Sequence, residues 1–206
     1  MKTKKNSDYP ASLYDAVRIM VALFMLLTSQ LLFAQGRLSV EFRPSANIPT
    51  SNFGPYALNA GGGFEAVGAY QFLPHLSAYA GWGRSTFGIV DTFAGPNSHF
   101  QETGYTYGLQ YIYSLTKDSK INLIIRGGGV TNHIEVENGN GDMITDSGHG
   151  FGWQLEECIV IPVGRKWSLL PGLRFRSLKS SFMVGSTETS GTLNYLSLGL
   201  GVRWQF

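Results

Sequence analysis

Apolar and polar side chains alternate strictly over residues 196–206, at the end of the chain. Side chains of a β-strand point to opposite faces with a period of two, so this segment is predicted to be a strand with one apolar and one polar face. Trp204 and Phe206 lie on the apolar face, whereas Arg203 and Gln205 lie on the polar face. Such a strand separates an apolar environment from a polar one.

The same alternation recurs earlier in the chain. Eight segments show it: 37–43, about 58–72, 76–87, about 101–113, 121 to about 135, 150–163, 167 to about 182, and 192–206. Most exceed the ~5–6 residues typical of soluble sheets and reach the ~9–11 residues with which a strand crosses a bilayer. The connections alternate in length. Short ones lie around Pro74, Lys117 and Arg165, and long ones at about 44–57, 88–100, 136–149 and 183–191. This pattern is typical of outer-membrane barrels, so we predict an all-β fold, an eight-stranded antiparallel up-and-down transmembrane β-barrel.

The N-terminal segment has the layout of a secretory signal peptide. Its basic residues are Lys2, Lys4, Lys5 and Arg18. An apolar stretch over 19–33 follows, and Ala34 precedes a plausible cleavage point. We predict a cleaved signal peptide at 1–34 and one barrel domain at 35–206. The alternative, a membrane anchor helix, is disfavoured because the apolar stretch is short for a span of ~20 residues.

Composition agrees with a membrane barrel. Without residues 1–34 the chain carries 12 basic and 12 acidic residues, so its basic character belongs to the leader and no nucleic-acid partner is expected. Charged residues make up 15% of the chain and aromatic residues 13%. Designed soluble surfaces aim for about 25–35% charged residues, so this chain is poor in charge for a soluble protein. The single cysteine, Cys158, excludes an intramolecular disulfide framework.

Aromatic residues on the apolar faces fall at two heights along the predicted strands. One group lies beside the short turns or the C-terminus: Tyr70, Phe72, Tyr111, Tyr113, Trp167, Trp204 and Phe206. The other lies nearer the long connections: Trp82, Tyr105, Tyr107, Phe151 and Trp153. We predict that the two groups form girdles in contact with outer-membrane lipid, at its two interfaces.

Charged residues on the polar faces are predicted to point into the lumen. They are Glu41, Arg43, Glu65, Arg126, Glu156, Arg174, Arg176 and Arg203. An eight-stranded barrel is just wide enough for side chains to fill, and buried charges need partners, so the prediction is an ion-paired plug. The alternative is a narrow, gated, porin-like pore that the arginines bias toward anions. Glu157 departs from the pattern. It shares the face of Trp153 and would meet lipid, unless a bulge turns it inward.

The chain resembles the small outer-membrane β-barrel proteins, the OmpA/OmpX-like group with an "outer membrane protein beta-barrel domain". The segments 76–83 and 198–206 carry the resemblance most clearly. It implies a place in the outer membrane of a Gram-negative cell, with both termini in the periplasm. It also implies that barrel-assembly machinery reads the C-terminal strand ending at Phe206. We expect a structural or surface-interaction role, in which four long extracellular loops meet a partner that the sequence does not name.

Two other classes of function compete with this interpretation. A soluble lipocalin-like carrier also has eight strands, but its apolar face points inward around a ligand. A lipid-modifying outer-membrane enzyme would need a catalytic group, for which His133, Glu135, Ser147 and His149 are candidates around the third long connection. Their spacing matches no known signature, so we expect neither enzymatic activity nor a cofactor. Two isolated histidines, His75 and His99, and the lone Cys158 predict no zinc cluster.

Overall fold

The computed structural model describes residues 37–90, 95–115, 121–184 and 186–206, together with Asp15, Arg18 and Met20. The predicted signal peptide and its cleavage point lie outside these residues, apart from those three. The chain separates into two units, Met1–Gly36 and Arg37–Phe206, of which the second carries the fold. Among the described residues, no helix has the length and apolar character needed to cross a membrane.

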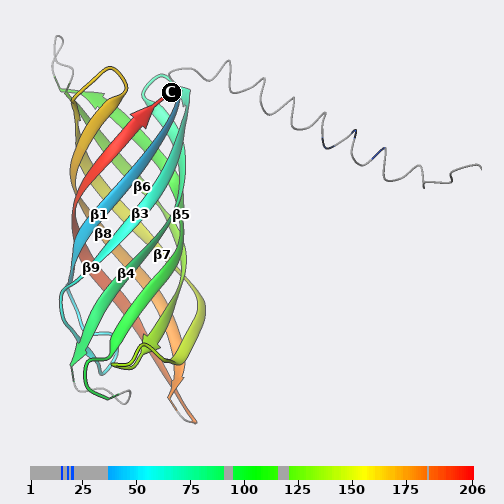
Figure 1. Cartoon of the computed structure of the whole chain (residues 1–206), viewed down its shortest axis with the longest axis vertical. Helices are drawn as coiled ribbons and strands as arrows, with labels where there is room; N and C mark the ends of the chain where they lie inside the picture. The colour runs from blue at the N-terminus through cyan, green and yellow to red at the C-terminus, as the bar shows by residue number, and fades with distance from the viewer. Residues whose placement is uncertain are drawn as a thin grey trace, which may run out of the picture. The chain divides into compact units, whose positions relative to one another are not determined.

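Eight long antiparallel strands form a closed barrel (Figure 1). They are β1 (Leu38–Pro49), β3 (Gly61–Leu73), β4 (Leu76–Val90), β5 (His99–Ser114), β6 (Asn122–Glu137), β7 (Met143–Pro162), β8 (Trp167–Val184) and β9 (Thr187–Gln205). Each strand pairs with the next, and β9 pairs with β1 to close the ring. The predicted eight-stranded up-and-down barrel is confirmed. A ninth, short strand, β2 (Ala57–Leu58), pairs with the end of β4.

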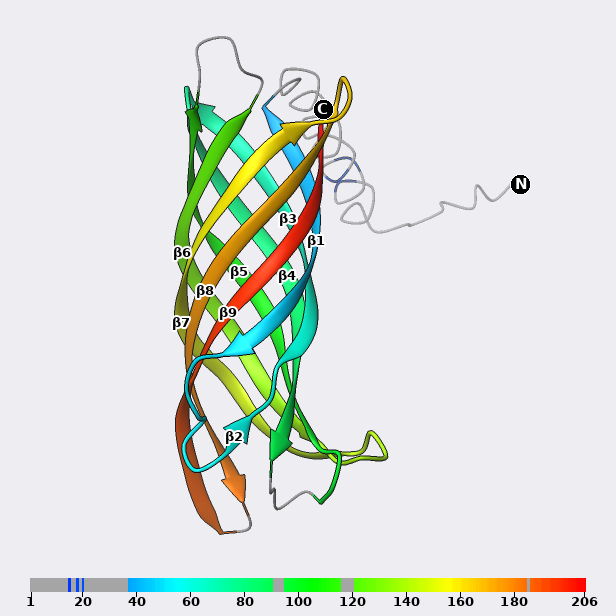
Figure 2. The same ribbon diagram turned by 90° about the vertical axis from the view of Figure 1, so that its left-hand side faces the viewer.

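The two ends of the barrel differ. One end, called the turn end here, carries the C-terminus and the tight connections at 74–75 and 163–166 (Figures 1 and 2). The turn predicted around Lys117 lies largely outside the described residues. The opposite end, called the loop end, carries the connection from β1 to β3, which crosses it and includes β2 (Figure 2).

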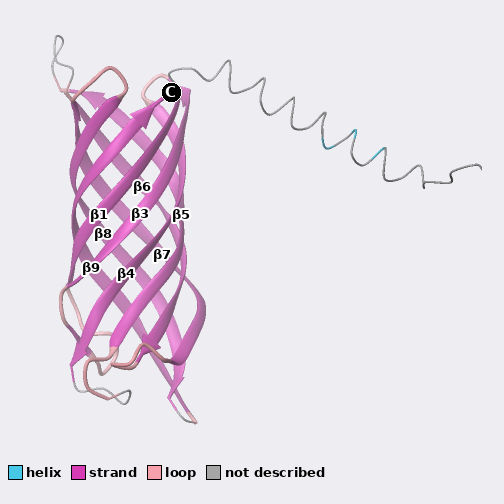
Figure 3. Ribbon diagram, viewed as in Figure 1, coloured by secondary structure: helices cyan, strands magenta, loops and turns pink. Residues whose placement is uncertain are grey.

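Strands run farther toward the loop end than predicted (Figure 3). The predicted long loop at 183–191 is wrong, because β8 continues to Val184 and β9 begins at Thr187. The predicted loop at 136–149 shrinks to the connection 138–142 between β6 and β7. These extensions mix apolar residues such as Val136 and Met143 with polar ones on no regular period, so they pair as strands without the alternation that marks a strand in the sequence.

The first strand also exceeds its prediction. It was expected to end at Arg43, but β1 continues to Pro49 and pairs with both β3 and β9. Pro44 lies inside it, opposite Phe64 of β3. A proline cannot donate a ladder hydrogen bond and is usually confined to strand edges. The pairing of β1 with β9 is correspondingly interrupted at Arg43 and Pro44. It resumes in the same register, from the pair Phe42–Val202 to the pair Ser45–Gly199.

The apolar faces of the strands point outward. Exposed residues of the wall include Val40, Phe42, Leu109, Ile125, Leu155, Ile159, Leu173, Leu198, Leu200 and Val202. A lipocalin-like arrangement needs these faces on the inside, so that alternative is wrong. A continuous apolar band of this extent is unfavourable in water and is the usual wall of a transmembrane barrel.

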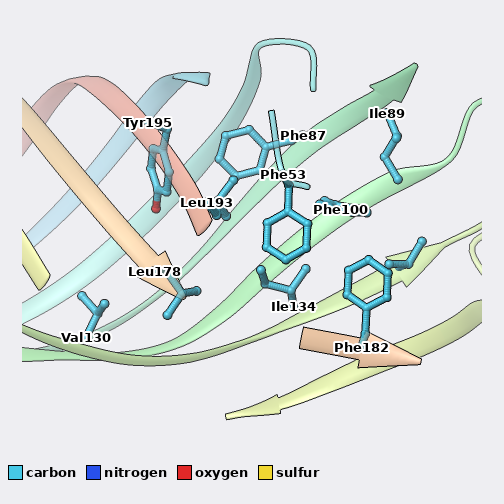
Figure 4. Packing of buried hydrophobic residues seen from close by; sticks show 11 residues of the cluster. Phe53, Phe87, Ile89, Phe100, Val130, Ile134, Leu178, Phe182, Leu193 and Tyr195 are labelled. Carbon is cyan, nitrogen blue, oxygen red and sulfur yellow. The ribbon is translucent and has the colours of Figure 1, made fainter. Parts of the chain in front are cut away.

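The lumen at the loop end holds an apolar cluster, here called the apolar plug (Figure 4). Its members are Phe53, Phe87, Ile89, Phe100, Val130, Ile134, Val136, Leu178, Phe182, Leu193 and Tyr195. Phe53 comes from the connection between β1 and β3 and is 0% exposed. Its ring stacks on Phe182 at 5.5 Å and meets Phe100 edge-on at 5.4 Å. The expectation that the segment 44–57 is a surface loop is therefore wrong at Phe53.

Candidate functional site

The predicted lumen charges lie together inside the barrel. All eight side chains come from inward positions of six strands, and none of the eight residues is more than 8% exposed. They are Glu41 and Arg43 of β1, Glu65 of β3, Arg126 of β6, Glu156 of β7, Arg174 and Arg176 of β8, and Arg203 of β9. Along β6, β7 and β8 they lie between the apolar plug and a smaller apolar cluster nearer the turn end, formed by Ile124, Cys158, Val160 and Leu170, whereas Arg203 lies closer to the turn end itself.

Glu65 is the first centre of this ion-pair network. Its Oε2 accepts hydrogen bonds from Arg43 and, at 2.5 Å, from Arg174 Nη1. Its Oε1 accepts one from Arg176 Nη2 at 3.0 Å. Because β3 and β8 are separated by two strands on the shorter way round the ring, the bonds from Arg174 and Arg176 reach across the lumen, whereas Arg43 is the register partner of Glu65 on β1. One carboxylate thus ties three arginines from two different strands.

Arg126 is the second centre and is fully buried. Its Nη2 donates to Glu41 Oε1 at 2.6 Å, and its Nη1 donates to Glu156 Oε1 at 3.1 Å. Its Nε donates to Gln110 Oε1 at 2.8 Å. Arg43 also donates to Glu156, so it joins the two centres into one network. Pairing of opposite charges in this way is what allows them to persist in a water-poor interior.

Glu102 of β5 completes the network and was not predicted. It is 1% exposed and accepts hydrogen bonds from Arg176 at 3.0 Å and from Asn132 at 2.5 Å. The hydroxyl of Tyr195 donates to it at 2.5 Å. Glu102 shares the polar face of Thr106 and Gln110, so the alternation could have identified it. The ring of Tyr195 belongs to the apolar plug, so this residue connects the plug to the network.

Little space remains in the lumen at this level. A cavity of about 20 Å³ lies beside Arg43, Glu156, Arg174 and Ser197. This volume holds about one water molecule. A larger hollow of about 370 Å³ opens at the turn end and reaches Arg203. The side chain of Arg203 is only loosely tied to the network, because its Nε lies 3.9 Å from Glu41 Oε1.

The predicted girdle residues lie on the outer wall. All are exposed except Trp204, which is half-buried because its ring packs edge-on against Trp167 at 4.5 Å. Lys166 lies 5.5 Å above the ring of Trp204. At the other height, Trp82 packs against Phe64 at 5.8 Å and Trp153 against Phe175 at 5.4 Å. Phe64 and Phe175 share the outward face and were not among the predicted girdle residues.

Glu157 faces outward. Strand β7 keeps one register with β8 from the pair Phe151–Lys179 to the pair Pro162–Ser168, so a bulge does not turn this residue inward. Its partners are Leu173 on β8 and Ile125 on β6, both exposed apolar residues. A carboxyl group on such a wall destabilises a barrel in lipid, although less than Arg or Lys does.

Phe206 ends the chain at the seam between the last and first strands. Its backbone N–H donates to the carbonyl of Leu38 at 3.1 Å, and its ring is exposed. The residue thus extends the pairing of β9 with β1 by one more bond.

The candidate catalytic residues are only partly brought together. His133 and Glu135 lie on β6, and His149 lies on β7 with its ring stacked on His133 at 5.3 Å. Ser147 is turned to the backbone, because its hydroxyl accepts from Ile134 N and donates to the Gly148 carbonyl, both at 2.8 Å. The group therefore does not present a serine nucleophile to an imidazole base.

Asp146 joins this group and was not predicted. Its Oδ2 lies 2.7 Å from His133 Nδ1, and its Oδ1 accepts from Gly148 N at 2.6 Å. Partial burial by itself raises the pKa of Asp146, but the hydrogen bonds from His133 and Gly148 and the neighbouring imidazoles bring that pKa below its ordinary value. The carboxylate is thus held in its charged form.

Comparison with known proteins identifies the fold. Neither the protein-family models nor the curated proteins give a match. Neisserial surface protein A has a solved structure that matches with a TM-score of 0.59 and 14% identity, over 82% of this chain and 97% of that one. OprG, an outer membrane protein of Pseudomonas aeruginosa, matches with a TM-score of 0.58 and 11% identity, over 84% and 98%. Outer Membrane Protein W of E. coli matches with 0.53 and 11%, over 84% and 98%. At these identities the likeness concerns the fold, which is that of the small outer-membrane β-barrel proteins.

Proposed function

We propose that this protein is an integral outer-membrane β-barrel with a closed lumen and a non-enzymatic role, either structural or in surface interaction. The observation that carries the proposal is the division between wall and lumen. The wall is apolar between two aromatic girdles, whereas the lumen is filled by the ion-pair network and by the apolar plug. A barrel with a filled lumen can contact other molecules only through its outer wall and the connections at its two ends.

The proposed orientation follows the asymmetry of the connections. Short turns of outer-membrane barrels face the periplasm and longer connections face the medium. The turn end, with the C-terminus, is then periplasmic and the loop end extracellular. This orientation includes export with residues 1–34 as a signal peptide and assembly by machinery that reads the strand ending at Phe206.

The contents of the lumen support closure over a pore. A conducting pathway needs a continuous aqueous route past the charged side chains. Here the network arginines share four buried glutamates, and the apolar plug stacks above them toward the loop end. An ion passing through the lumen would have to cross both the ion-pair network and the apolar plug.

Exposed apolar side chains at the loop end support surface interaction. Met143 and Ile144 begin β7, and Met183 lies near the end of β8; all three are exposed. The hydroxyl of Thr145 donates to the carbonyl of Met183 at 3.1 Å, which holds the two hairpins together. These residues lie beyond Phe151 of the girdle, where lipid does not cover them. A protein partner at the cell surface fits an apolar patch of this kind.

Membrane fractionation followed by planar-bilayer recording tests the proposal. The full-length protein is expected in the Sarkosyl-insoluble fraction, with a band on SDS gels that shifts on boiling, because a closed sheet pairs every backbone polar group. The same folded protein is expected to give no conductance steps. A soluble band without a shift would overturn the membrane assignment, and reproducible steps from heat-modifiable protein would overturn the closed lumen.

A further inference from the structure

Four potential metal ligands meet on the outer side of β6 and β7, beyond the loop-end girdle. His133 and Glu135 are two residues apart on β6 and therefore share one face. Their register partners on β7 are His149 and Asp146. One ligand atom from each of His133, Glu135 and Asp146 lies within 4.8 Å of the other two.

A β-bulge creates this arrangement. Continuing the register of the pair His133–His149 would place Ser147 opposite Glu135. Instead the register shifts by one residue, and Glu135 pairs with Asp146. Gly148 provides the turn in the chain, with a φ of +62° that glycine adopts without steric cost. The bulge thus exchanges a hydroxyl for a carboxylate, and bulges often re-aim side chains beside functional sites.

Both carboxylates are held by a second layer of donors. Asp146 Oδ1 accepts from Gly148 N at 2.6 Å, and Glu135 Oε2 accepts from Gln101 Nε2 at 3.0 Å. Arg84 in turn donates to the amide oxygen of Gln101. The remaining oxygens, Asp146 Oδ2 and Glu135 Oε1, lie 2.7 Å and 3.9 Å from His133 Nδ1. Orientation of ligands by outer hydrogen bonds is characteristic of metal sites.

We propose that His133, Glu135 and Asp146 bind a first-row divalent transition-metal ion, with Zn²⁺ as the reference ion. Tetrahedral zinc ligands at ~2.1 Å from the metal lie about 3.4 Å apart, between the two distances found here. Binding requires the His133 tautomer that carries its proton on Nε2. An imidazole with two carboxylates favours such an ion over Ca²⁺, which takes six to eight oxygen ligands.

The location leaves the site open to the medium. His133 lies two residues beyond Thr131, which is the register partner of the girdle residue Phe151. The three ligand side chains are partly exposed, so an ion can enter without opening the barrel. Solvent completes the coordination, and His149 lies alongside the imidazole of His133.

Calorimetric titration of the folded protein in micelles with ZnCl₂ tests the proposal. The protein must lack a polyhistidine tag, and the heat-modifiable band confirms folding of each variant. We expect one saturable site and no saturation by CaCl₂. His133→Ala and Asp146→Asn should weaken Zn²⁺ binding by more than about tenfold, and Gln101→Ala by about tenfold.

His75→Ala is the matched control, because His75 lies in the connection 74–75 at the turn end. It should leave zinc affinity unchanged. Co²⁺ provides a second readout through its visible absorption band, which should disappear in His133→Ala. The proposal is overturned if the unaltered protein does not bind Zn²⁺, or if His133→Ala and His75→Ala bind it equally.

Discussion

The two levels of the lumen are filled by opposite chemistry on the same strands. Along β8, the inward positions carry Arg174 and Arg176 and then Leu178 and Phe182. The arginines belong to the ion-pair network, and the two apolar residues belong to the apolar plug. Hydrogen-bonded ion pairs across the lumen stabilise the network, whereas close packing of apolar side chains stabilises the apolar plug. The comparison shows that a narrow barrel can be closed by either means.

The two levels also differ in which parts of the chain build them. Strand residues alone form the network, so it can open only if the barrel itself deforms. The apolar plug includes Phe53, which comes from the connection between β1 and β3. This connection can leave the lumen while the strands stay paired. We therefore expect perturbations of the network to act globally and perturbations of Phe53 to act locally.

The largest effect is expected for Glu65→Gln. The substitution leaves Arg43, Arg174 and Arg176 without their shared carboxylate, and breaking a buried ion pair costs about 3–5 kcal/mol. The free energy of unfolding in lipid vesicles, measured by urea titration, should fall by that amount. Glu157→Gln is the matched control, because the same change on the outer wall removes a charge from an apolar surface and should not destabilise. Equal losses in the two variants would contradict the role given to Glu65.

A smaller and more local effect is expected for Phe53→Ala. Removing a buried phenylalanine ring costs at least about 3 kcal/mol where the surroundings cannot relax, but detachment of the connection limits the loss here. Cleavage by added protease within 50–60 should accelerate, while the heat-modifiable barrel band persists. Asn52→Ala changes the exposed neighbour and should behave like the unaltered protein. If cleavage of the Phe53 variant is not faster, the connection does not depend on the apolar plug.

The sequence predicted the wall and the polar level of the lumen but not the apolar level. Period-two alternation identifies a strand when its two faces differ, as at Leu155 and Glu156. Toward the loop end of β8 the buried inward residues Leu178 and Phe182 are apolar and the outward Lys179 is polar, so the alternation reverses and no longer tells which face lies inside. Phe53 lies outside any alternating segment, so its place in the lumen depends on the path of a connection. Contacts such as Glu65 with Arg176 depend on closure of the ring, which is a property of the whole sheet.

The grouping of His133, Glu135 and Asp146, the proposed metal ligands, was missed for another reason. His133 and Glu135 fell at the end of the predicted strand 121–135 and Asp146 in the predicted long loop 136–149, so no spacing in the sequence defined their geometry. The pairing of Glu135 with Asp146 depends on a shift of register at Gly148, and a bulge is set by backbone conformation. Sequence spacing alone would have paired Glu135 with Ser147.

The smallest effect is expected for Arg203→Met. This substitution tests whether the arginines of the ion-pair network contribute unequally to stability. Five arginines share four buried glutamates, and Arg203 is the arginine most loosely attached, at 3.9 Å from Glu41. Its loss should change the free energy of unfolding by less than about 1 kcal/mol, as for a weak ion pair near solvent. Arg126→Met is the paired variant. Arg126 donates to Glu41, Glu156 and Gln110 and is fully buried, so its loss should cost about 3–5 kcal/mol. If the charges of the network were equivalent, the two variants would lose the same free energy of unfolding. If the network is organised around Arg126 and Glu65, Arg126→Met loses more than Arg203→Met.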